Sequence, residues 1–241
     1  MVMEADTDFG HVLLCVICDG MGGLSKGELA SATVIRAFAA WFREELPGIL
    51  CEASLKDSLF SSWENLLIRM NDLVYRYGEA YGLRLGTTVC ASLFVGSQYY
   101  IVNVGDSRAY RLTDEMIPLT RDQSFVQMEI DAGRMTKEQA LTSSMRSVLL
   151  YCIGANETVQ PDFYTGVFGS GELFLLCSDG FVHTVPENEM FNYLDPDDLS
   201  DETGMLTAAA VLTEMIKQRQ ETDNISAILM PLHGKLWDRQ K

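Results

Sequence analysis

The segment from Val12 to Gly23 constrains the fold most, because a short apolar run ends abruptly in a carboxylate and a group of glycines. Residues 12–18 have the composition and length of a strand buried on both faces. Asp19 follows directly, and three of the next four residues are glycine. Glycine allows a sharp turn and a close approach of a ligand to the backbone. We therefore expect a buried strand that holds Asp19 rigidly at its tip.

The order of helical and extended patterns predicts the fold class. Helical spacing of apolar residues predicts long helices over residues 25–46, 54–82 and 206–218 and shorter ones over 124–132 and 187–194. Strands are expected over residues 12–18, 87–95, 99–104, 109–112 and 225–230, and residues 163–167 and 173–177 are predicted to form a hairpin. These elements come in blocks, which favours antiparallel sheets covered by helices. We expect an α+β fold in which two stacked antiparallel sheets lie between layers of helices.

Composition narrows the class of partner. The 241 residues are 47% hydrophobic, enough for one domain with a large core. Lys and Arg number 18 against 34 Asp and Glu, which gives a net charge of −16. Such a surface disfavours nucleic acid and attracts metal cations. No stretch has the pattern of a secretory signal or a membrane span, so we expect a cytoplasmic protein without membrane insertion.

Cysteine and histidine spacing suggests a second class of function. Cys15 and Cys18 form a C-x-x-C pair, a pattern found in redox and zinc proteins. Residues three apart in a strand point to opposite faces, however, so these thiols are expected to act as small buried hydrophobes. The histidines, His11, His183 and His233, show no ligand spacing. A zinc or redox protein is therefore the weakest hypothesis.

Three aspartates occupy equivalent positions at the ends of predicted strands. Asp19 and Asp179 each follow an apolar strand and precede glycine, and Asp223 lies just before the last strand. A single Asp-Gly pair is by itself more typical of a turn. Three carboxylates converging on one rim would repel each other unless cations lay between them. Oxygen ligands of this kind suit Mg²⁺ or Mn²⁺.

A set of short motifs, in order along the chain, resembles one family. The matching segments are Asp19-Gly-Met-Gly-Gly23, Gly27-Glu28, Ala30-Ser31, Gly86-Thr-Thr88, Val104-Gly-Asp-Ser-Arg108, Leu119-Thr-Arg-Asp-Gln-Ser124, Val126-Gln127, Cys177-Ser-Asp-Gly180 and Thr222-Asp-Asn224. Together they resemble the metal-dependent serine/threonine protein phosphatases of the type 2C or PPM family in their bacterial form. The resemblance spans residues 12 to 230. It implies a four-layer α-β-β-α sandwich with a binuclear metal centre at one end.

The resemblance also assigns roles to individual residues. Asp19 would bridge two Mn²⁺ or Mg²⁺ ions, and the Gly20 carbonyl would bind one of them. Asp179 and Asp223 would complete the ligands of the other ion. Asp122 matches the residue that helps to hold a third, weaker ion in bacterial members. Catalysis would use a water that bridges the metals at Asp19 to attack phosphoserine or phosphothreonine, with no side-chain nucleophile.

Further expectations concern organisation and partners. The resemblance implies one catalytic domain over residues 1–241, with a flap subdomain at about 121–150 that governs substrate choice. It also implies phosphoprotein substrates that a serine/threonine kinase modifies, and we expect a monomer that binds no nucleic acid. Lys26 and Arg121 flank the site motifs and are weak candidates for phosphate contacts. We interpret Asp106 and Arg108 as a structural pair that satisfies buried backbone groups.

The sequence departs from the family pattern in two places. Family members carry a phosphate-binding Arg and an acidic pair before the first metal aspartate. Eighteen residues precede Asp19 and none is Arg, so either the chain is truncated or it lacks that strand. Gln123 stands where histidine is usual. These departures keep an alternative open, a catalytically weak phosphatase-like domain that binds phosphoproteins or regulates them.

Overall fold

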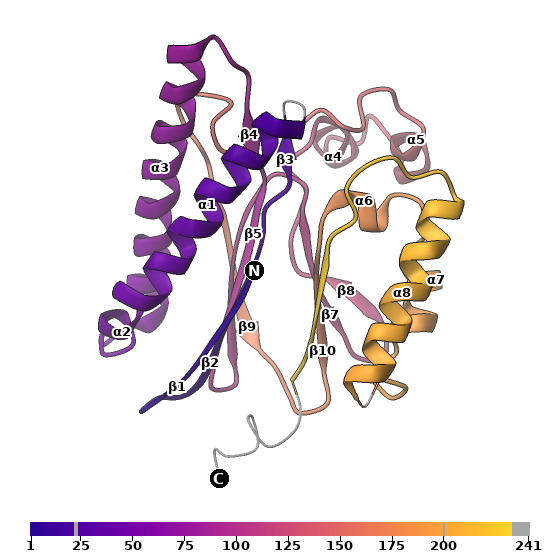
Figure 1. The fold of residues 1–241 in the computed structure, drawn as a ribbon. Coiled ribbons are helices and arrows are strands. Elements are labelled where there is room, and N and C mark those ends of the chain that lie inside the picture. Colours follow the sequence, from indigo (N-terminus) through magenta and orange to yellow (C-terminus); the bar gives the residue numbers. More distant parts are fainter. Residues whose placement is uncertain (22–23, 200, 233–241) are drawn as a thin grey trace.

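A computed structural model describes residues 1–21, 24–199 and 201–232. In this part of the chain the strands form two antiparallel sheets and one short ribbon. Figure 1 shows the sheets face to face, with α1–α3 outside one and α7 and α8 outside the other, so the predicted α+β sandwich of four layers is confirmed. Gly22 and Gly23 of the first motif lie outside the described residues.

The elements of each layer come from distant parts of the sequence. Sheet 1 has the order β1 (Val2–Thr7), β2 (Gly10–Ile17), β5 (Val89–Val95), β6 (Gln98–Val104), β9 (Asp162–Val167). Sheet 2 has the order β11 (Ala227–Pro231), β10 (Leu173–Cys177), β7 (Arg108–Leu112), β8 (Met116–Pro118), and the ribbon pairs β3 (Gly20–Met21) with β4 (Gly86–Thr87). The helices are α1 (Leu24–Glu44), α2 (Leu46–Ile49), α3 (Leu55–Tyr81), α4 (Phe125–Asp131), α5 (Lys137–Leu141), α6 (Asp179–Val182), α7 (Glu187–Leu194) and α8 (Glu202–Gln218).

Strand β2 explains why the apolar runs in the sequence are continuous. Leu14 and Val16 belong to the core between sheet 1 and helices α1 and α3. Cys15 and Ile17, on the opposite face, belong to the core between the two sheets. Because side chains alternate along a strand, a strand with helices on one side and a sheet on the other must be apolar at every position.

Aromatic side chains fill the space between the sheets. The rings of Phe94 and Phe174 meet edge to face, with centroids 5.0 Å apart and an interplanar angle of 84°. Tyr99 and Phe168 also meet Phe174 edge to face, at centroid distances of 5.4 and 6.0 Å. This geometry stabilises aromatic pairs beyond the burial of their area. The cluster therefore holds the two sheets at a fixed spacing.

The predicted hairpin of residues 163–177 is wrong. Strand β9 pairs with β6 in sheet 1, whereas β10 pairs with β7 and β11 in sheet 2. The connection crosses from one sheet to the other at Phe168, whose N–H donates to the carbonyl of Ser97. A hairpin and a crossover have the same local signal here, two apolar strands joined by a glycine-rich turn. What distinguishes the crossover is the position of Phe168, whose ring packs against Phe94 and Phe174 between the sheets.

The long helices begin and end at recognisable signals. Helix α3 starts after Ser54 and ends at Gly82, whose φ of +61° suits a glycine after a helix. Helix α8 starts at Glu202, four residues before the predicted Leu206, because the Asp201 side chain accepts from the Gly204 N–H at 2.7 Å. Among the described helices, none is long and apolar enough to cross a bilayer.

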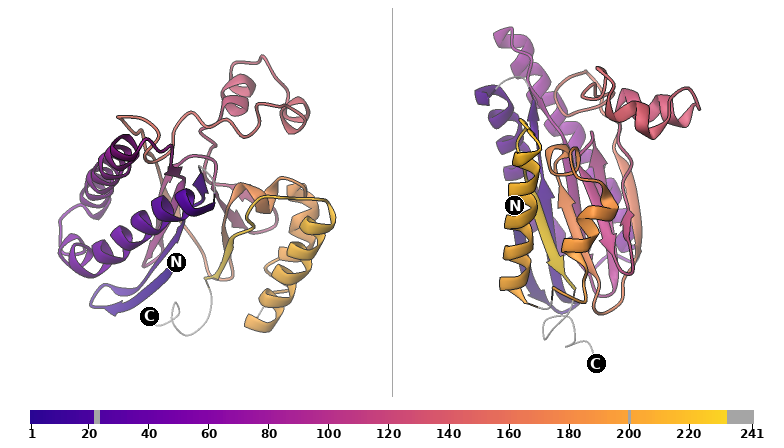
Figure 2. Two further views of the ribbon diagram at one scale, coloured as in Figure 1. Left: turned by 45° about the horizontal axis from the view of Figure 1, so that its top comes forward. Right: turned by 90° about the vertical axis from the view of Figure 1, so that its right-hand side faces the viewer.

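Helices α4 and α5 lie in a segment that projects from the rest of the molecule (Figure 2, left). The two ends of the segment are joined by backbone hydrogen bonds. The Phe125 N–H donates to the Val148 carbonyl, and the Leu150 N–H donates to the Gln123 carbonyl, both at 2.8 Å. The segment is thus closed at its base and open to solvent beyond it.

Replacing Phe174 by alanine should lower the free energy of unfolding by about 3–5 kcal/mol, because it opens a cavity between the sheets. Phe9→Ala is the matched control, since Phe9 is 48% exposed at the β1–β2 turn and should change stability by less than about 0.5 kcal/mol. Urea denaturation measures both values. Equal losses in the two variants would contradict this account of the core.

Candidate metal centre

The three aspartates singled out in the sequence come from three segments at one end of the sandwich. Asp19 follows β2, Asp179 is the first residue of α6, and Asp223 lies between α8 and β11. Figure 1 shows β3, α6 and helices α4 and α5 of the projecting segment at this same end. The three carboxylates lie near enough for Asp179 and Asp223 to raise the pKa of Asp19.

The backbone of Asp19 is fixed by the Gly86-Thr-Thr88 motif. The Asp19 N–H donates to the Thr88 hydroxyl at 2.9 Å, and the Asp19 carbonyl accepts from the Thr88 N–H at 2.8 Å and the Thr87 hydroxyl at 2.9 Å. The Thr88 hydroxyl in turn lies 2.7 Å from that of Ser107. Since all these groups are paired, the chain has little freedom to move the Asp19 carboxylate.

Gly20 and Gly27 bring the next turn against the start of α1. A Cβ added to Gly20 would lie 2.3 Å from the Gly27 carbonyl oxygen, and one added to Gly27 would lie 2.5 Å from the Gly20 carbonyl. Side chains at either position would push the two backbones apart. The glycines thus place the Gly20 carbonyl beside the helix, next to Asp19.

Asp179 and Asp223 are brought together by the backbone contacts around them. The Ser178 hydroxyl donates to the Asn224 carbonyl at 3.0 Å and accepts from the Ser226 N–H at 3.1 Å. A Cβ on Gly180 would lie 2.6 Å from the Asn224 carbonyl oxygen and 3.3 Å from the Asp223 Cβ. The Cys177-Ser-Asp-Gly180 motif therefore packs against the segment that carries Asp223 and holds its backbone in place.

The electrostatics show that the carboxylates interact. Burial, together with the charges of Asp179 and Asp223, raises the pKa of Asp19 to about 7. Burial also raises the pKa of Asp179, which His183 lowers and Asp223 raises. Asp19 is therefore harder to ionise because Asp179 and Asp223 are near. A cation bound between the carboxylates would instead lower the pKa of Asp19 and favour its ionised form.

The donors fit hard divalent cations. Carboxylate and carbonyl oxygens are the ligands that Mg²⁺ and Mn²⁺ prefer. In the described residues, no group of three or more Asp, Glu, His or Cys side chains is already arranged as a ligand set. One oxygen of Asp179 and one of Asp223 each accept a hydrogen bond from the N–H of the next residue, at 2.7 Å.

Asp122, the predicted ligand of a third ion, is engaged by arginine. Arg108 donates from Nε and Nη2 to the two Asp122 oxygens at 2.8 and 2.7 Å, and from Nη1 to the Tyr110 hydroxyl at 3.0 Å. Such a bidentate pair is among the stronger side-chain contacts. Asp122 remains a predicted ligand, but it would have to give up part of this pair to bind an ion.

The neighbouring motif residues are mainly structural. Among the described residues, Arg108 donates to the Asp122 and Tyr110 side chains, whereas we expected it to satisfy buried backbone groups. Burial raises the pKa of Asp106 well above its usual value, and Asp179 and Asp122 add to the shift. Gln123 accepts from the Gly105 N–H and donates to the Gln160 carbonyl and the Asp162 carboxylate, so it ties three segments together.

Two other sets of candidate residues have different roles. Arg121 forms an ion pair with Asp131 of helix α4. Burial raises the pKa of Cys15 and of Cys177 to about 12, and the six cysteines are free thiols. Thiols with such pKa values are inert at neutral pH, which favours their interpretation as small hydrophobes over zinc or redox chemistry.

Sequence analysis missed two polar residues beside the aspartates. His183 lies between Asp179 and Glu221, and the Glu221 side chain is almost fully buried. Burial raises the pKa of Glu221, but the N–H groups of Asp223 and Thr222 outweigh it and lower the pKa overall, with help from His183 and Arg146. The i, i+4 spacing of Asp179 and His183 was the available signal.

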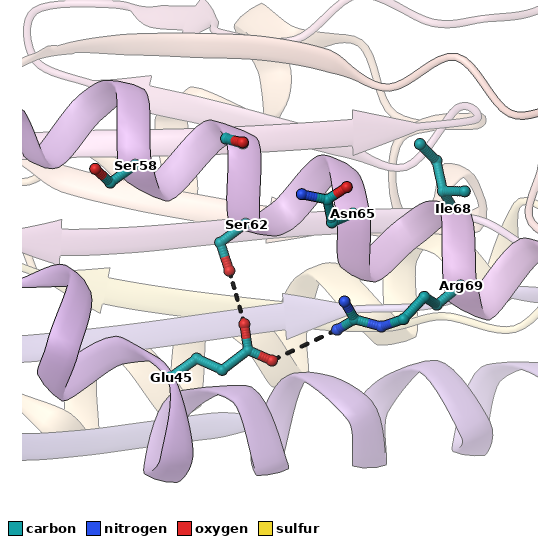
Figure 3. A pocket seen from close by; sticks show the side chains of 7 residues that line it. Glu45, Ser58, Ser62, Asn65, Ile68 and Arg69 are labelled. Carbon is teal, nitrogen blue, oxygen red and sulfur yellow. Dashed lines mark hydrogen bonds and ion pairs between the residues drawn. The ribbon is translucent and has the colours of Figure 1, made fainter.

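Two hollows lie apart from the carboxylates of the candidate centre. One of about 490 Å³ lies on the outer helices, where Glu45 accepts from Ser62 and pairs with Arg69 (Figure 3). Another, of about 460 Å³, is lined by Met21, Arg84 and residues near them. Neither contains an aspartate of the centre, so the candidate site rests on the carboxylates rather than on cavity size.

Comparisons with known proteins agree with this fold and site. A sequence model of the Protein phosphatase 2C family matches residues 5–230. The chain is 33% identical over 179 residues to the serine/threonine phosphatase stp of Listeria innocua, covering 73% of this chain and 69% of that one. The chain therefore belongs to the protein phosphatase 2C family of metal-dependent serine/threonine protein phosphatases, which confirms the resemblance.

Solved structures show the same relationship. Serine/threonine phosphatase Stp1 from Staphylococcus aureus shares 26% identity with a TM-score of 0.82, over 97% of this chain and 89% of that one. The catalytic domain of the phosphatase PstP, solved in complex with two manganese ions, shares 29% identity with a TM-score of 0.71, over 90% of this chain and 86% of that one. The family thus includes a member with two bound manganese ions.

Replacing Asp19 by asparagine should stabilise the metal-free protein by about 1 kcal/mol, because it removes one of three carboxylates that repel each other. Urea denaturation in EDTA measures the gain. Asp114→Asn, in an exposed turn, is the control and should leave stability unchanged. A less stable Asp19→Asn protein in EDTA would contradict the proposed repulsion.

Proposed function

We propose that this phosphatase hydrolyses phosphoserine and phosphothreonine in proteins at a centre for two Mn²⁺ or Mg²⁺ ions. Asp19 would bridge the ions, the Gly20 carbonyl would bind one, and Asp179 and Asp223 would bind the other. The observation that carries the proposal is the raised pKa of Asp19, caused by burial and by the other two carboxylates. Such a site is unfavourable without cations and favourable with them.

Each group has a distinct part in this chemistry. When bound, the ions would supply an activated water and neutralise the charge of the phosphate. The chain holds Asp19 through its paired backbone and holds Asp179 and Asp223 through the Ser178–Asn224 contact. Neutralisation matters here because a protein of net charge −16 repels a phosphate dianion.

The remaining assignments follow from family membership. We infer a single catalytic domain over residues 1–241, in which the segment of about residues 121–150 acts as the flap that selects substrates. The substrates would be phosphoproteins modified by a serine/threonine kinase. Asp122 would contribute to a third, weaker ion only after loosening its pair with Arg108.

A second candidate function is a phosphatase-like module that binds phosphoproteins with little turnover. One observation favours it. No Arg occurs in residues 1–18, and the partly buried Arg108 is already paired with Asp122, so phosphate would find few cationic side chains at the centre. Binding of a phosphopeptide without its hydrolysis at saturating Mn²⁺ would support this alternative.

Asp179→Asn should lower Mn²⁺-dependent hydrolysis of p-nitrophenyl phosphate and of a phosphothreonine peptide by roughly a hundredfold or more. It should also abolish the rise in melting temperature on adding Mn²⁺. Asp198→Asn, in the exposed acidic loop, keeps the same net charge and should retain both properties. Full activity of the Asp179→Asn protein would overturn the proposed site.

A further inference from the structure

His183 connects two segments of the centre. Its Nε2 lies 3.4 Å from Asp179 Oδ2, and its Nδ1 lies 3.5 Å from Glu221 Oε2. The imidazole is 19% exposed. Both ring nitrogens thus face a carboxylate oxygen, one on α6 and one on the segment that leads into β11.

Glu221 is itself tied to the segment that carries Asp223. Its Oε1 accepts from the N–H groups of Thr222 and Asp223, at 2.8 and 3.0 Å. Its Oε2 is buried and, among the described residues, accepts no hydrogen bond. The side chain is only 4% exposed. A buried carboxylate oxygen is costly unless a polar or charged partner is near, and His183 is in that position.

The backbone immediately before Glu221 adopts an unusual conformation. Gln220 has a φ of +66°, and it is the non-glycine residue with positive φ in the described part of the chain. It follows the last turn of α8, where glycine is the usual residue in this conformation. Keeping a side chain at Gln220 costs stability, which suggests that the placement of Glu221 is required.

We propose that His183 and Glu221 are positioning residues for the metal centre. The imidazole holds the Asp179 carboxylate from one side, and Glu221 fixes the backbone of Thr222 and Asp223 from the other. Together they set the spacing of two carboxylates that would otherwise repel each other. This inference rests on the proposed function, in which Asp179 and Asp223 bind metal.

The bridge that His183 forms between Asp179 and Glu221 differs from the other contacts between α6 and the segment before β11. Ser178 and Gly180 fix the backbone around Asp179 and Asn224. His183 instead faces the Asp179 carboxylate, the group that would bind the ion. Partners of this kind orient metal ligands, and their loss typically weakens metal affinity by roughly 10- to 100-fold.

The test measures Mn²⁺ binding by titration calorimetry on the full chain, for His183→Gln, Glu221→Gln and the double variant. Each single variant should weaken Mn²⁺ affinity about tenfold, and the double variant no more than either one, because both break the same bridge. The control is His11→Gln, since His11 also lies near two carboxylates, those of Glu4 and Asp6, on the β1–β2 hairpin. This variant should bind Mn²⁺ like the wild type.

Two further readouts separate positioning from general stability. At saturating Mn²⁺, kcat for p-nitrophenyl phosphate should recover to within about threefold of wild type, because the ligands themselves are intact. In the metal-free protein, amide hydrogen exchange at Thr222 and Asp223 should become faster in Glu221→Gln than in wild type. Unchanged Mn²⁺ affinity in folded variants, or a double variant whose loss equals the product of the single losses, would overturn the bridge.

Failure of the proposed function would give a different result. In that case wild type and Asp179→Asn would bind Mn²⁺ equally, and the positioning role would fall with it. If Asp179→Asn loses Mn²⁺ binding while the His183 and Glu221 variants keep it, only the bridge is wrong. Should His183→Gln fail to fold, Glu221→Gln decides alone, because it keeps the size of the side chain.

Discussion

The mutual repulsion of three neighbouring carboxylates is the constraint on which the rest of this structure depends. Bringing Asp19, Asp179 and Asp223 together costs folding free energy, which favourable interactions elsewhere in the protein must offset. The sandwich supplies that stability through its three apolar layers, one between the sheets and one under each layer of helices. The carboxylates sit at the rim, where the rigid strands end and solvent begins.

The short motifs are better understood as supports than as reactive groups. The Thr87 and Thr88 hydroxyls bind the backbone of Asp19, and Ser178 binds the backbone around Asn224. Gly27 and Gly180 act by having no side chain, since a Cβ on either would collide with a facing backbone. Each motif therefore controls where a carboxylate points, although few of its side chains would touch an ion.

The sequence was sufficient to predict features that depend on local patterns. Apolar runs that end in Asp19 and Asp179 predicted buried strands and a shared rim, and the structure brings these two carboxylates near enough for Asp179 to raise the pKa of Asp19. Strand pairing was harder, because the turn before Leu173 is compatible with a hairpin or a crossover. The pairing of Arg108 with Asp122 was also hidden, since it depends on how β7 lies against residues 14 positions further along.

Long-range polar contacts were the least predictable part. His183 looked isolated in the sequence because its partner Glu221 lies 38 positions later, directly after the turn at Gln220. Gln123 likewise gave no sign that its amide would join Gly105, Gln160 and Asp162. Such contacts follow from the assembled layers, so they cannot be read from neighbouring residues.

The closed base of the projecting segment has a consequence for how such proteins diversify. The chain enters and leaves the segment side by side. Backbone hydrogen bonds join Phe125 to Val148 and Leu150 to Gln123. A loop anchored in this way is an interchangeable module, because its length and composition can vary without moving the ends that enter the sandwich. New recognition properties can therefore arise by grafting at residues 126–147 while the chemistry stays in place.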